Sequence, residues 1–378
     1  MIKVCHIVNL ITGKSDGVFS HIMMILKNYD RSRFEHFVIF QGEEIVEKNL
    51  SELNIKYYIV DSLQRKYSIK SFIEIYQIIK TENPTILHTH LIKPYILIGL
   101  INVILKKKTI FNYHGSFIVN DYNTSIEKLV YKLLHNIIEL TNPIDLVLVP
   151  SVRSKEMLRI ETSAFKNIDV YYNGYEYEEL NYSVDQYLLQ KINELKSEEK
   201  KLICSIGRLN REKRFDRAIM ICDKLINRGF EINLFIFGDG EKELELKDLV
   251  KRNNLGGNVT FTGYIANAGL YLKYFDLLLI TSDREGMPFA LWEAMGNKIP
   301  VVAPDVGGLK EILVENNCGF VYEPSDLNEA TEKILRLLKD KMYRKELGEN
   351  GKKTVEYVYN ARNFIKKIEQ SYTNLLAE

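Results

Sequence analysis

Two carboxylates, Glu285 and Glu293, frame an almost wholly apolar segment in the stretch EGMPFALWEAMG. Pro288 suits the first turn of a helix and Gly296 suits its end, so apolar residues would cover nearly every direction around the helix axis. Such a helix belongs in an interior, where an unpaired carboxylate is costly. Either a basic side chain pairs with Glu293, or the two carboxylates accept hydrogen bonds from the hydroxyls of a bound sugar.

Four basic residues follow another predicted strand. The segment RLNREKRFD comes after LICSIG and places these cations just before a predicted helix, at Arg208, Arg211, Lys213 and Arg214. A helix N-terminus is already partly positive, so cations gathered there indicate a bound anion such as a phosphate. A solvated charged loop is the alternative, and the spacing does not choose between the two.

Backbone amides offer further anion-binding groups. The first helical turn after Pro288 would leave three N–H groups free, at Phe289, Ala290 and Leu291. Gly307 and Gly308 allow the backbone to approach a phosphate, although such pairs are equally common in plain turns. Gly17 lies in a similar loop near the N-terminus. The full G-x-G-x-x-G fingerprint is absent, which disfavours a nicotinamide cofactor.

Three histidines lie at predicted strand ends, in LHTHL and NYHGSF. His88 and His90 alternate on a strand, so both rings point the same way, a spacing that zinc could use. No cysteine or acidic third ligand is nearby, which favours a hydrogen-bonded pair at the sheet rim, and we predict no metal site. His114 precedes a glycine; whether it contacts a substrate stays open.

Short β-branched segments alternate with amphipathic helical segments, which is typical of parallel sheets in βαβ units. The predicted strands are residues 3–10, 35–41, 56–61, 85–91, 109–115, 146–151, 201–208, 232–240, 259–264, 277–282 and 300–305. A chain of 378 residues suggests two domains, and the strand pattern pauses after Asn173 and Gly174. We therefore predict an α/β protein with two Rossmann-like, doubly wound domains, residues 1–175 and 176–360, facing across a cleft at the strands' carboxyl ends.

The bulk composition limits the possible partners and compartments. The net charge of +1 argues against nucleic acid as the main partner. The four cysteines show no C-x-x-C spacing and indicate a reducing compartment. The stretch MIKVCHIVNL resembles a first strand rather than a signal peptide, and YILIGLINVIL is about half the length of a spanning helix. We expect a cytoplasmic protein. The segment IKPYILIGLINVILKKKTIF would be either a membrane-surface element or, as the sequence favours, a core helix ending in solvated lysines.

Five motifs occur together in the second half: GRLNREK, FIFGDGE, VTFTGY, EGMPFALWEAMG and PVVAPDVGG. With this order and spacing, the sequence resembles the GT-B glycosyltransferases, specifically the large retaining family four (glycosyl transferases group 1). The resemblance implies transfer of a sugar from a nucleotide-diphosphate sugar, with UDP as the expected nucleotide, to a glycan or lipid-linked acceptor in cell-surface polysaccharide biosynthesis. No D-x-D pair appears beside a predicted strand end, so we expect no metal at the phosphates and no other cofactor. The alternatives are a nucleotide-sugar epimerase and a non-catalytic nucleotide-sugar-binding protein on the same fold.

The resemblance also assigns roles in the donor-binding second domain. It implies that Arg208 and Lys213 neutralise the donor diphosphate, that Glu293 binds ribose and that Glu285 contacts the transferred sugar. Tyr264 and Ile265 match positions that contact the base. Arg214 stands where a glycine is common, and Pro288, which has no N–H, cannot donate a hydrogen bond to the ligand.

In the first, acceptor-binding domain, the resemblance implies that Gly17 approaches the phosphate and that His114 faces the sugar near its anomeric carbon. His114, Glu285, Arg208 and Lys213 are thus the predicted catalytic residues. Asp16 stands where a second glycine is frequent. A C-terminal helix at about residues 361–378 would pack back on this domain.

Overall fold

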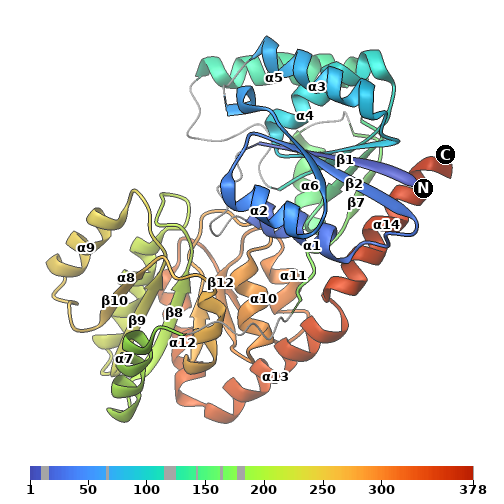
Figure 1. The fold of residues 1–378 in the computed structure, drawn as a ribbon. Coiled ribbons are helices and arrows are strands. Elements are labelled where there is room, and N and C mark those ends of the chain that lie inside the picture. Colours follow the sequence, from blue (N-terminus) through green and yellow to red (C-terminus); the bar gives the residue numbers. More distant parts are fainter. Residues whose placement is uncertain are drawn as a thin grey trace. The chain divides into compact units, whose positions relative to one another are not determined.

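The computed structural model describes residues 1–9, 17–64, 68–114, 125–141, 144–161, 165–176 and 184–377. These residues form two compact units. The first unit is Met1–Gly174 together with Ala361–Glu378, and the second is Tyr175–Asn360. Figure 1 shows that each unit is built around its own sheet flanked by helices.

The first unit contains a seven-stranded sheet in the order β3-β2-β1-β4-β5-β6-β7, in which every neighbouring pair is parallel. Its strands are β1 (Ile2–Val8), β2 (Phe34–Phe40), β3 (Lys56–Ile59), β4 (Ile86–His90), β5 (Lys108–Asn112), β6 (Leu146–Val149) and β7 (Ile168–Val170). The strand order reverses between β1 and β4, and a reversal of this kind is where doubly wound sheets bind ligands.

Helices cover both faces of this sheet (Figure 1). They are α1 (Gly17–Asn28), α2 (Glu44–Glu52), α3 (Ile69–Glu82), α4 (Ile92–Leu105), α5 (Ser125–Thr141), α6 (Val152–Glu161) and α14 (Ala361–Ala377), with a 3-10 turn, η1 (Asp61–Gln64). Cys5 and Ile7 of β1 pack toward α3 and α4, whereas Val8 packs with α1 and α2. Helix α14 packs against α1 and buries Ile368 and Tyr372.

The second unit contains a six-stranded parallel sheet in the order β10-β9-β8-β11-β12-β13. Its strands are β8 (Lys201–Ile206), β9 (Ile232–Phe237), β10 (Val259–Gly263), β11 (Leu277–Leu279), β12 (Val301–Pro304) and β13 (Gly319–Tyr322). The helices are α7 (Gln186–Ser197), α8 (Phe215–Ile226), α9 (Glu243–Arg252), α10 (Phe289–Gly296), α11 (Leu309–Leu313), α12 (Leu327–Lys339) and α13 (Lys341–Tyr357), with a 3-10 helix, η2 (Ala268–Tyr274).

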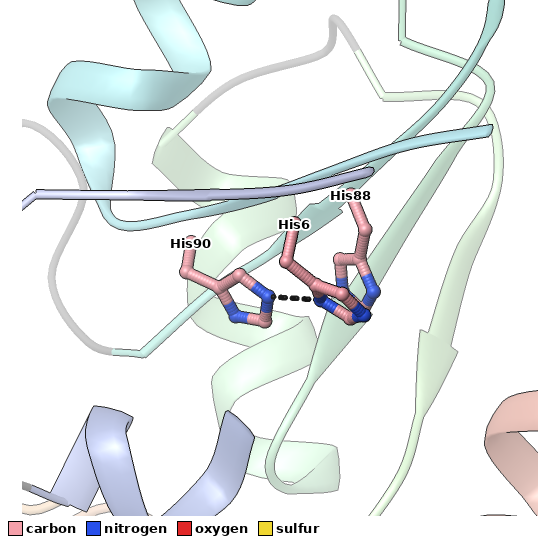
Figure 2. Close-up of side chains that lie close together, drawn as sticks. All are labelled: His6, His88 and His90. Atoms are coloured by element: carbon pink, nitrogen blue, oxygen red, sulfur yellow. Dashed lines mark hydrogen bonds between the residues drawn. The ribbon is translucent and has the colours of Figure 1, made fainter. Parts of the chain in front are cut away.

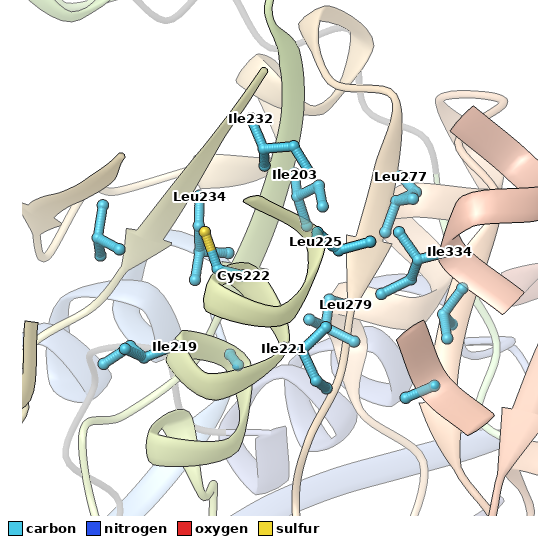
Figure 3. Packing of buried hydrophobic residues seen from close by; sticks show 14 of the residues in the cluster. Ile203, Ile219, Ile221, Cys222, Leu225, Ile232, Leu234, Leu277, Leu279 and Ile334 are labelled. Carbon is cyan, nitrogen blue, oxygen red and sulfur yellow. The ribbon is translucent and has the colours of Figure 1, made fainter. Parts of the chain in front are cut away.

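The core of the second unit lies between the sheet and helices α8 and α12. Figure 3 shows Ile219, Cys222 and Leu225 of α8 and Ile334 of α12 packed against the strands. Apolar residues on both faces of parallel strands are what helix-covered sheets require. On the remaining face, α10 packs against α13, where Gly348 lets the backbone carbonyl of Lys298, just after α10, approach closely. This packing holds α10, the helix that carries Glu293, in a fixed position.

The predicted α/β class with two doubly wound parallel sheets is confirmed. All the predicted strands are present, but the short strands β7 and β13 were missed. The helix after Glu285 begins at Phe289, with Pro288 as its N-cap residue rather than in its first turn.

The segment considered as a membrane-surface element forms α4, a core helix with Tyr95, Ile98 and Ile101 fully buried. The lysines that follow it have polar neighbours: the Lys107 ammonium donates to Asn83, and that of Lys108 lies 3.7 Å from the Asp145 carboxylate. In the part of the chain that the structure describes, no helix combines the length and apolarity needed to cross a membrane.

Candidate functional site

The strand order of the second unit reverses between β8 and β11, so the loops after these strands lie beside each other. The Asp283 amide donates to the Glu212 carbonyl at 2.9 Å, and the Thr281 hydroxyl donates to the Lys213 carbonyl at 3.0 Å. The loops enclose a small pocket lined by Ile206, Lys213, Phe215, Leu279, Ile280, Thr281, Ser282, Glu285, Pro288 and Ala290. The basic loop and the first of the two predicted carboxylates therefore meet at one place.

Lys213 and Glu285 form an ion pair in this pocket. The Lys213 ammonium lies 2.6 Å from Oε1 of Glu285, and the Ser282 hydroxyl donates to the same oxygen at 2.6 Å. The Glu285 side chain is only 7% exposed. Both bonds go to Oε1, so Oε2 remains to accept from a ligand hydroxyl, and the ammonium has further N–H donors for an anion. The predicted phosphate-binding and sugar-binding groups thus contact each other directly.

The other cations of the basic loop differ in their partners. Arg208 is exposed, and its guanidinium forms no ion pair with any residue in the described ranges. Arg214 instead pairs with Asp216 at 2.9 Å and with Asp283 at 3.2 Å. The interpretation that all four cations hold an anion is therefore wrong for Arg214, because two carboxylates already neutralise it. Its φ of 51° also explains why a glycine would suit this position.

Glu293 has no such partner. Its carboxylate forms no hydrogen bond or ion pair with any side chain among the described residues, although it lies in a helix whose neighbouring residues Trp292 and Ala294 are fully buried. Burial raises its pKa to about 7. At Gly269, an added Cβ would lie 3.1 Å from the carboxylate carbon, so this glycine leaves room for the side chain. The fold supplies no basic partner here, which leaves the carboxylate available to a ligand.

The amino end of α10 provides two of the three predicted amides. No side chain caps this helix, but the Leu291 amide donates to the Pro288 carbonyl at 3.0 Å. The prediction of a free N–H at Leu291 is therefore wrong, because a tight turn at the N-cap uses it. The amides of Phe289 and Ala290 are left at the helix start, beside the pocket that Ala290 lines.

The Gly307–Gly308 turn has a packing role. Gly307 has a φ of 55°, and a Cβ there would lie 2.0 Å from the Glu285 carbonyl oxygen. Only glycine permits this contact between the loop after β12 and the loop that carries Glu285. Of the two possibilities left open by the sequence, the structure shows a turn, in which Gly307 approaches the backbone of the site itself.

Tyr264 and Ile265 lie apart from this pocket. They follow β10, the edge strand of the sheet, and neither residue lines the pocket. The Tyr264 side chain is exposed and that of Ile265 is half-buried.

The two predicted residues of the first unit lie on different elements. Gly17 is the exposed first residue of α1. His114 follows β5, and its Nε2 accepts from the Asn112 amide at 2.7 Å and lies 3.4 Å from Nδ1 of His90. Burial, and then the neighbouring histidines 21 and 88, hold the pKa of His114 well below its usual value. Its ring is therefore neutral at physiological pH.

The sequence did not predict how many histidines gather in the first unit. His88 and His90 do point the same way, with ring centroids 4.4 Å apart, but they are fully buried rather than at a rim. His6 of β1, His21 of α1 and His36 of β2 complete a cluster of six histidine rings with His114. The usable signal was strand alternation, since His6 pairs in register with His88 across β1 and β4.

Comparison with known proteins identifies the family to which this fold belongs. Family models for glycosyltransferase family 4 and for glycosyl transferases group 1 match residues 15–179 and 189–354, respectively. The chain is 25% identical over 182 residues to N-acetyl-alpha-D-glucosaminyl L-malate synthase of Bacillus anthracis, covering 48% of each chain. It is 24% identical over 176 residues to the capsular polysaccharide biosynthesis glycosyltransferase CapM of Staphylococcus aureus, covering 46% of each.

These alignments span about half the length of the relatives. Among solved structures, Anabaena HepE in complex with UDP-glucose matches with a TM-score of 0.80 at 19% identity, over 99% of this chain and 100% of that one. Two doubly wound parallel sheets of this kind define the GT-B class. The chain belongs to glycosyltransferase family 4 within that class.

Proposed function

We propose that this chain is a retaining glycosyltransferase that uses a nucleotide-diphosphate sugar, with UDP as the nucleotide, and needs no metal ion at the phosphates. The observation that carries the proposal is the pairing of Lys213 with Glu285 where the strand order reverses, followed in the chain by the unpartnered Glu293. The UDP-glucose complex of HepE supports the choice of nucleotide. The sequence offers no D-x-D pair of the kind that commonly holds a phosphate-bound cation.

Each group of the second unit fits one part of such a donor. Arg208 and Lys213 supply positive charge to the diphosphate, with the amides of Phe289 and Ala290 as additional donors. Oε2 of Glu285 accepts from a hydroxyl of the transferred sugar. The Glu293 carboxylate accepts from the ribose diol, which provides the partner that the fold does not. In this proposal, Tyr264 and Ile265 contact the base.

The proposed reaction breaks the bond between the anomeric carbon and the diphosphate oxygen. The acceptor hydroxyl forms the new bond to that carbon on the same face, and its proton passes to the leaving phosphate oxygen. Lys213 and Arg208 stabilise the charge that develops on the leaving group, a term that is often the largest in catalysis. His114, which is neutral at physiological pH, can hydrogen-bond to the sugar without adding charge.

We assign the acceptor and the residues Gly17 and His114 to the first unit. A glycan or lipid-linked acceptor in cell-surface polysaccharide assembly is supported by the resemblance to CapM. In this proposal the protein acts in the cytoplasm, at the inner face of the membrane where a lipid-linked acceptor would be presented.

A thermal-shift panel of UDP-, GDP- and ADP-sugars tests donor binding directly. We expect the UDP-sugars to raise the melting temperature of the wild-type chain and to lose this effect in Lys213→Ala. Lys224→Ala is the matched control, because Lys224 lies at the other end of α8 and bonds only to Asn328 in the described chain. Equal stabilisation of both variants would contradict the assigned diphosphate site.

Product analysis separates transfer from the alternatives. With donor and a glycan acceptor, we expect a glycoside of retained anomeric configuration, formed at the same rate when Mg²⁺ or Mn²⁺ is added. An isomeric nucleotide sugar formed from donor alone would identify an epimerase. Tight donor binding without any product, over a panel of glycan and lipid-linked acceptors, would favour a non-catalytic binding protein.

A further inference from the structure

Three histidine rings converge in the interior of the first unit. His6 extends from β1 and His88 and His90 from β4, the strands between which the order reverses, and all three side chains are fully buried. Each offers a ring nitrogen, and these nitrogens all lie within 4.8 Å of one another. Figure 2 shows the three rings gathered on one side of their strands. We propose that these histidines form a binding site for a transition-metal ion of the zinc class.

The spacing suits a metal ion. Nδ1 of His6 lies 3.1 Å from Nε2 of His90. Two nitrogens bound tetrahedrally to zinc at about 2.0–2.1 Å are separated by roughly 3.3 Å. This pair therefore needs to separate by only a few tenths of an ångström, and the His88 nitrogen, which lies within 4.8 Å of both, would move inward to complete the set. Three neutral imidazoles select Zn²⁺ and its neighbours, Co²⁺, Ni²⁺ and Cu²⁺, rather than Mg²⁺ or Ca²⁺.

The nitrogen of each ring that faces away from the metal position already has a partner. Nε2 of His6 lies 2.8 Å from Nδ1 of His36, Nδ1 of His88 lies 2.8 Å from the Tyr372 hydroxyl, and Nδ1 of His90 faces His114 at 3.4 Å. Metal-binding histidines characteristically use their second nitrogen in this way, which fixes the ring and its tautomer.

The hydrogen-bond network sets the tautomer of His90. The Tyr171 hydroxyl donates to Oδ1 of Asn112, so the Asn112 amide nitrogen is the donor to Nε2 of His114. Nε2 of His114 is then an acceptor, and Nδ1 of His90 carries the proton that faces it. Nε2 of His90 is left with a lone pair directed toward Nδ1 of His6, as a metal ligand requires. Nδ1 of His6 donates to this lone pair in the metal-free chain, so metal binding shifts the His6 proton to Nε2, which faces His36.

His88 supplies an independent indication. Its Nε2 is buried and no hydrogen bond of acceptable geometry reaches it from the described residues. A buried polar atom left unsatisfied costs roughly 1–3 kcal/mol, and a metal ion would remove this cost. The second group of histidines that could hold a metal, His21, His90 and His114, is less suitable, since the Asn112 amide occupies Nε2 of His114.

Such an ion would join the two central strands and, through His88 and Tyr372, the C-terminal helix α14. Three ligands leave a fourth position for water. The histidines belong to the first unit and the pocket with Lys213 and Glu285 to the second, and the inference does not depend on the proposed transferase activity.

Cobalt titration of the full chain, prepared without a histidine tag and stripped with a chelator, tests the proposal. We expect one equivalent of Co²⁺ to bind with the visible spectrum of a low-symmetry tetrahedral site, to be displaced by Zn²⁺, and to raise the melting temperature. His88→Gln should abolish the spectrum. His135→Gln is the matched control, because His135 is also buried but bonds to Tyr95 outside the cluster.

Tyr372→Phe keeps all three rings and removes only the partner of His88, so it tests the site even if His88→Gln fails to fold. We expect this variant to bind Co²⁺ about 10–100-fold more weakly than the wild type. The proposal is overturned if the stripped wild-type chain binds no Co²⁺ saturably, or if a folded His88→Gln chain binds it as tightly. In either case the cluster is a hydrogen-bonded histidine core alone.

Discussion

At the residue scale, two glutamates only eight positions apart have opposite environments. Glu285 shares one oxygen with Lys213 and Ser282, whereas Glu293 has no partner among the described residues. A carboxylate that is held near an apolar interior without a cation keeps its proton to a higher pH. Glu285 is therefore part of a preorganised ion pair, whereas Glu293 is available to accept hydrogen bonds from ligand hydroxyls.

The raised pKa of Glu293 predicts a pH-dependent stability. Unfolded, the carboxyl has its ordinary pKa of 4.5, and folded it has a pKa of about 7, so the native state binds the proton more tightly. As pH rises from 4.5 to 7 the unfolded state loses this proton first, and stability falls by at most about 3 kcal/mol. Glu293→Gln should lack this loss and gain stability over the wild type at pH 8, but not at pH 4.5, in urea unfolding. If the free energy of unfolding of both proteins changed with pH in the same way, Glu293 would not be the group with the raised pKa.

Nucleotide binding should depend on the same group. Ribose hydroxyls donate to the ionised carboxylate, so a bound nucleotide should lower the pKa of Glu293. UDP affinity should therefore rise with pH up to about 7 and then level off, with protons released on binding below that pH. Calorimetry in two buffers of different ionisation enthalpy measures the release. Glu293→Gln should bind UDP more weakly and release no protons on binding. If this variant released as many protons as the wild type, the protons would come from another group.

At the scale of elements, the site depends on close contacts between loops that follow neighbouring strands. Gly307, after β12, contacts the Glu285 carbonyl, and Gly238, after β9, makes an equally close approach to the carbonyl of Gly207 after β8. Glycines that seem suited to phosphate binding can thus act by letting loop backbones meet. The loops then hold Lys213 and Glu285 within hydrogen-bond distance.

Gly307→Ala tests this arrangement. The φ of 55° alone costs an alanine about 1–2 kcal/mol. The Cβ would also lie 2.0 Å from the Glu285 carbonyl oxygen, so the loop must shift. We expect a loss of at least this stability in urea unfolding and a lower affinity for UDP-sugars. Gly257→Ala is the control, since nothing lies within 4 Å of the added Cβ there. The same small effect from both substitutions would show that the loop contact is unimportant.

At the scale of the whole molecule, the chain leaves the first unit at Gly174 and re-enters it at Ala361. Helix α14 therefore completes the first unit from the far end of the sequence, where it packs against α1 and bonds to His88 through Tyr372. The stability of the first unit should depend on this last segment.

Ile368→Ala tests the contribution of α14. Ile368 is 1% exposed, and truncating a buried isoleucine to alanine typically costs about 2–5 kcal/mol. Calorimetry should show a lower melting temperature for the transition of the first unit only, because two units can unfold separately. Lys366→Ala, an exposed position on the same helix, should change neither transition. A shift of the second unit's transition instead would place the helix's main contribution there.

The local pattern of residues was enough to predict the α/β class and the strands that form the centres of both sheets. Most of these strands are apolar runs rich in Val, Ile, Leu and Phe between turn signals, and parallel strands covered by helices need such runs. It missed β7, where the charged Asp169 interrupts the apolar run, and β13, which begins at Gly319, whereas the equally short β11 is an uninterrupted run of leucines. The types and order of the site residues were also readable from the sequence.

The partners of those residues were decided by the tertiary structure. Sequence spacing cannot show that Arg214 is neutralised by Asp283, that Gly307 meets Glu285, or that Lys213 meets it across 72 positions. Nor can it bring His6 to His90, 84 positions away. Burial and hydrogen bonding depend on which strands are neighbours, and this is a property of the folded sheet rather than of any local segment. For this reason the sequence determined which chemical groups the protein has, and the fold determined which of them remain free to bind a ligand.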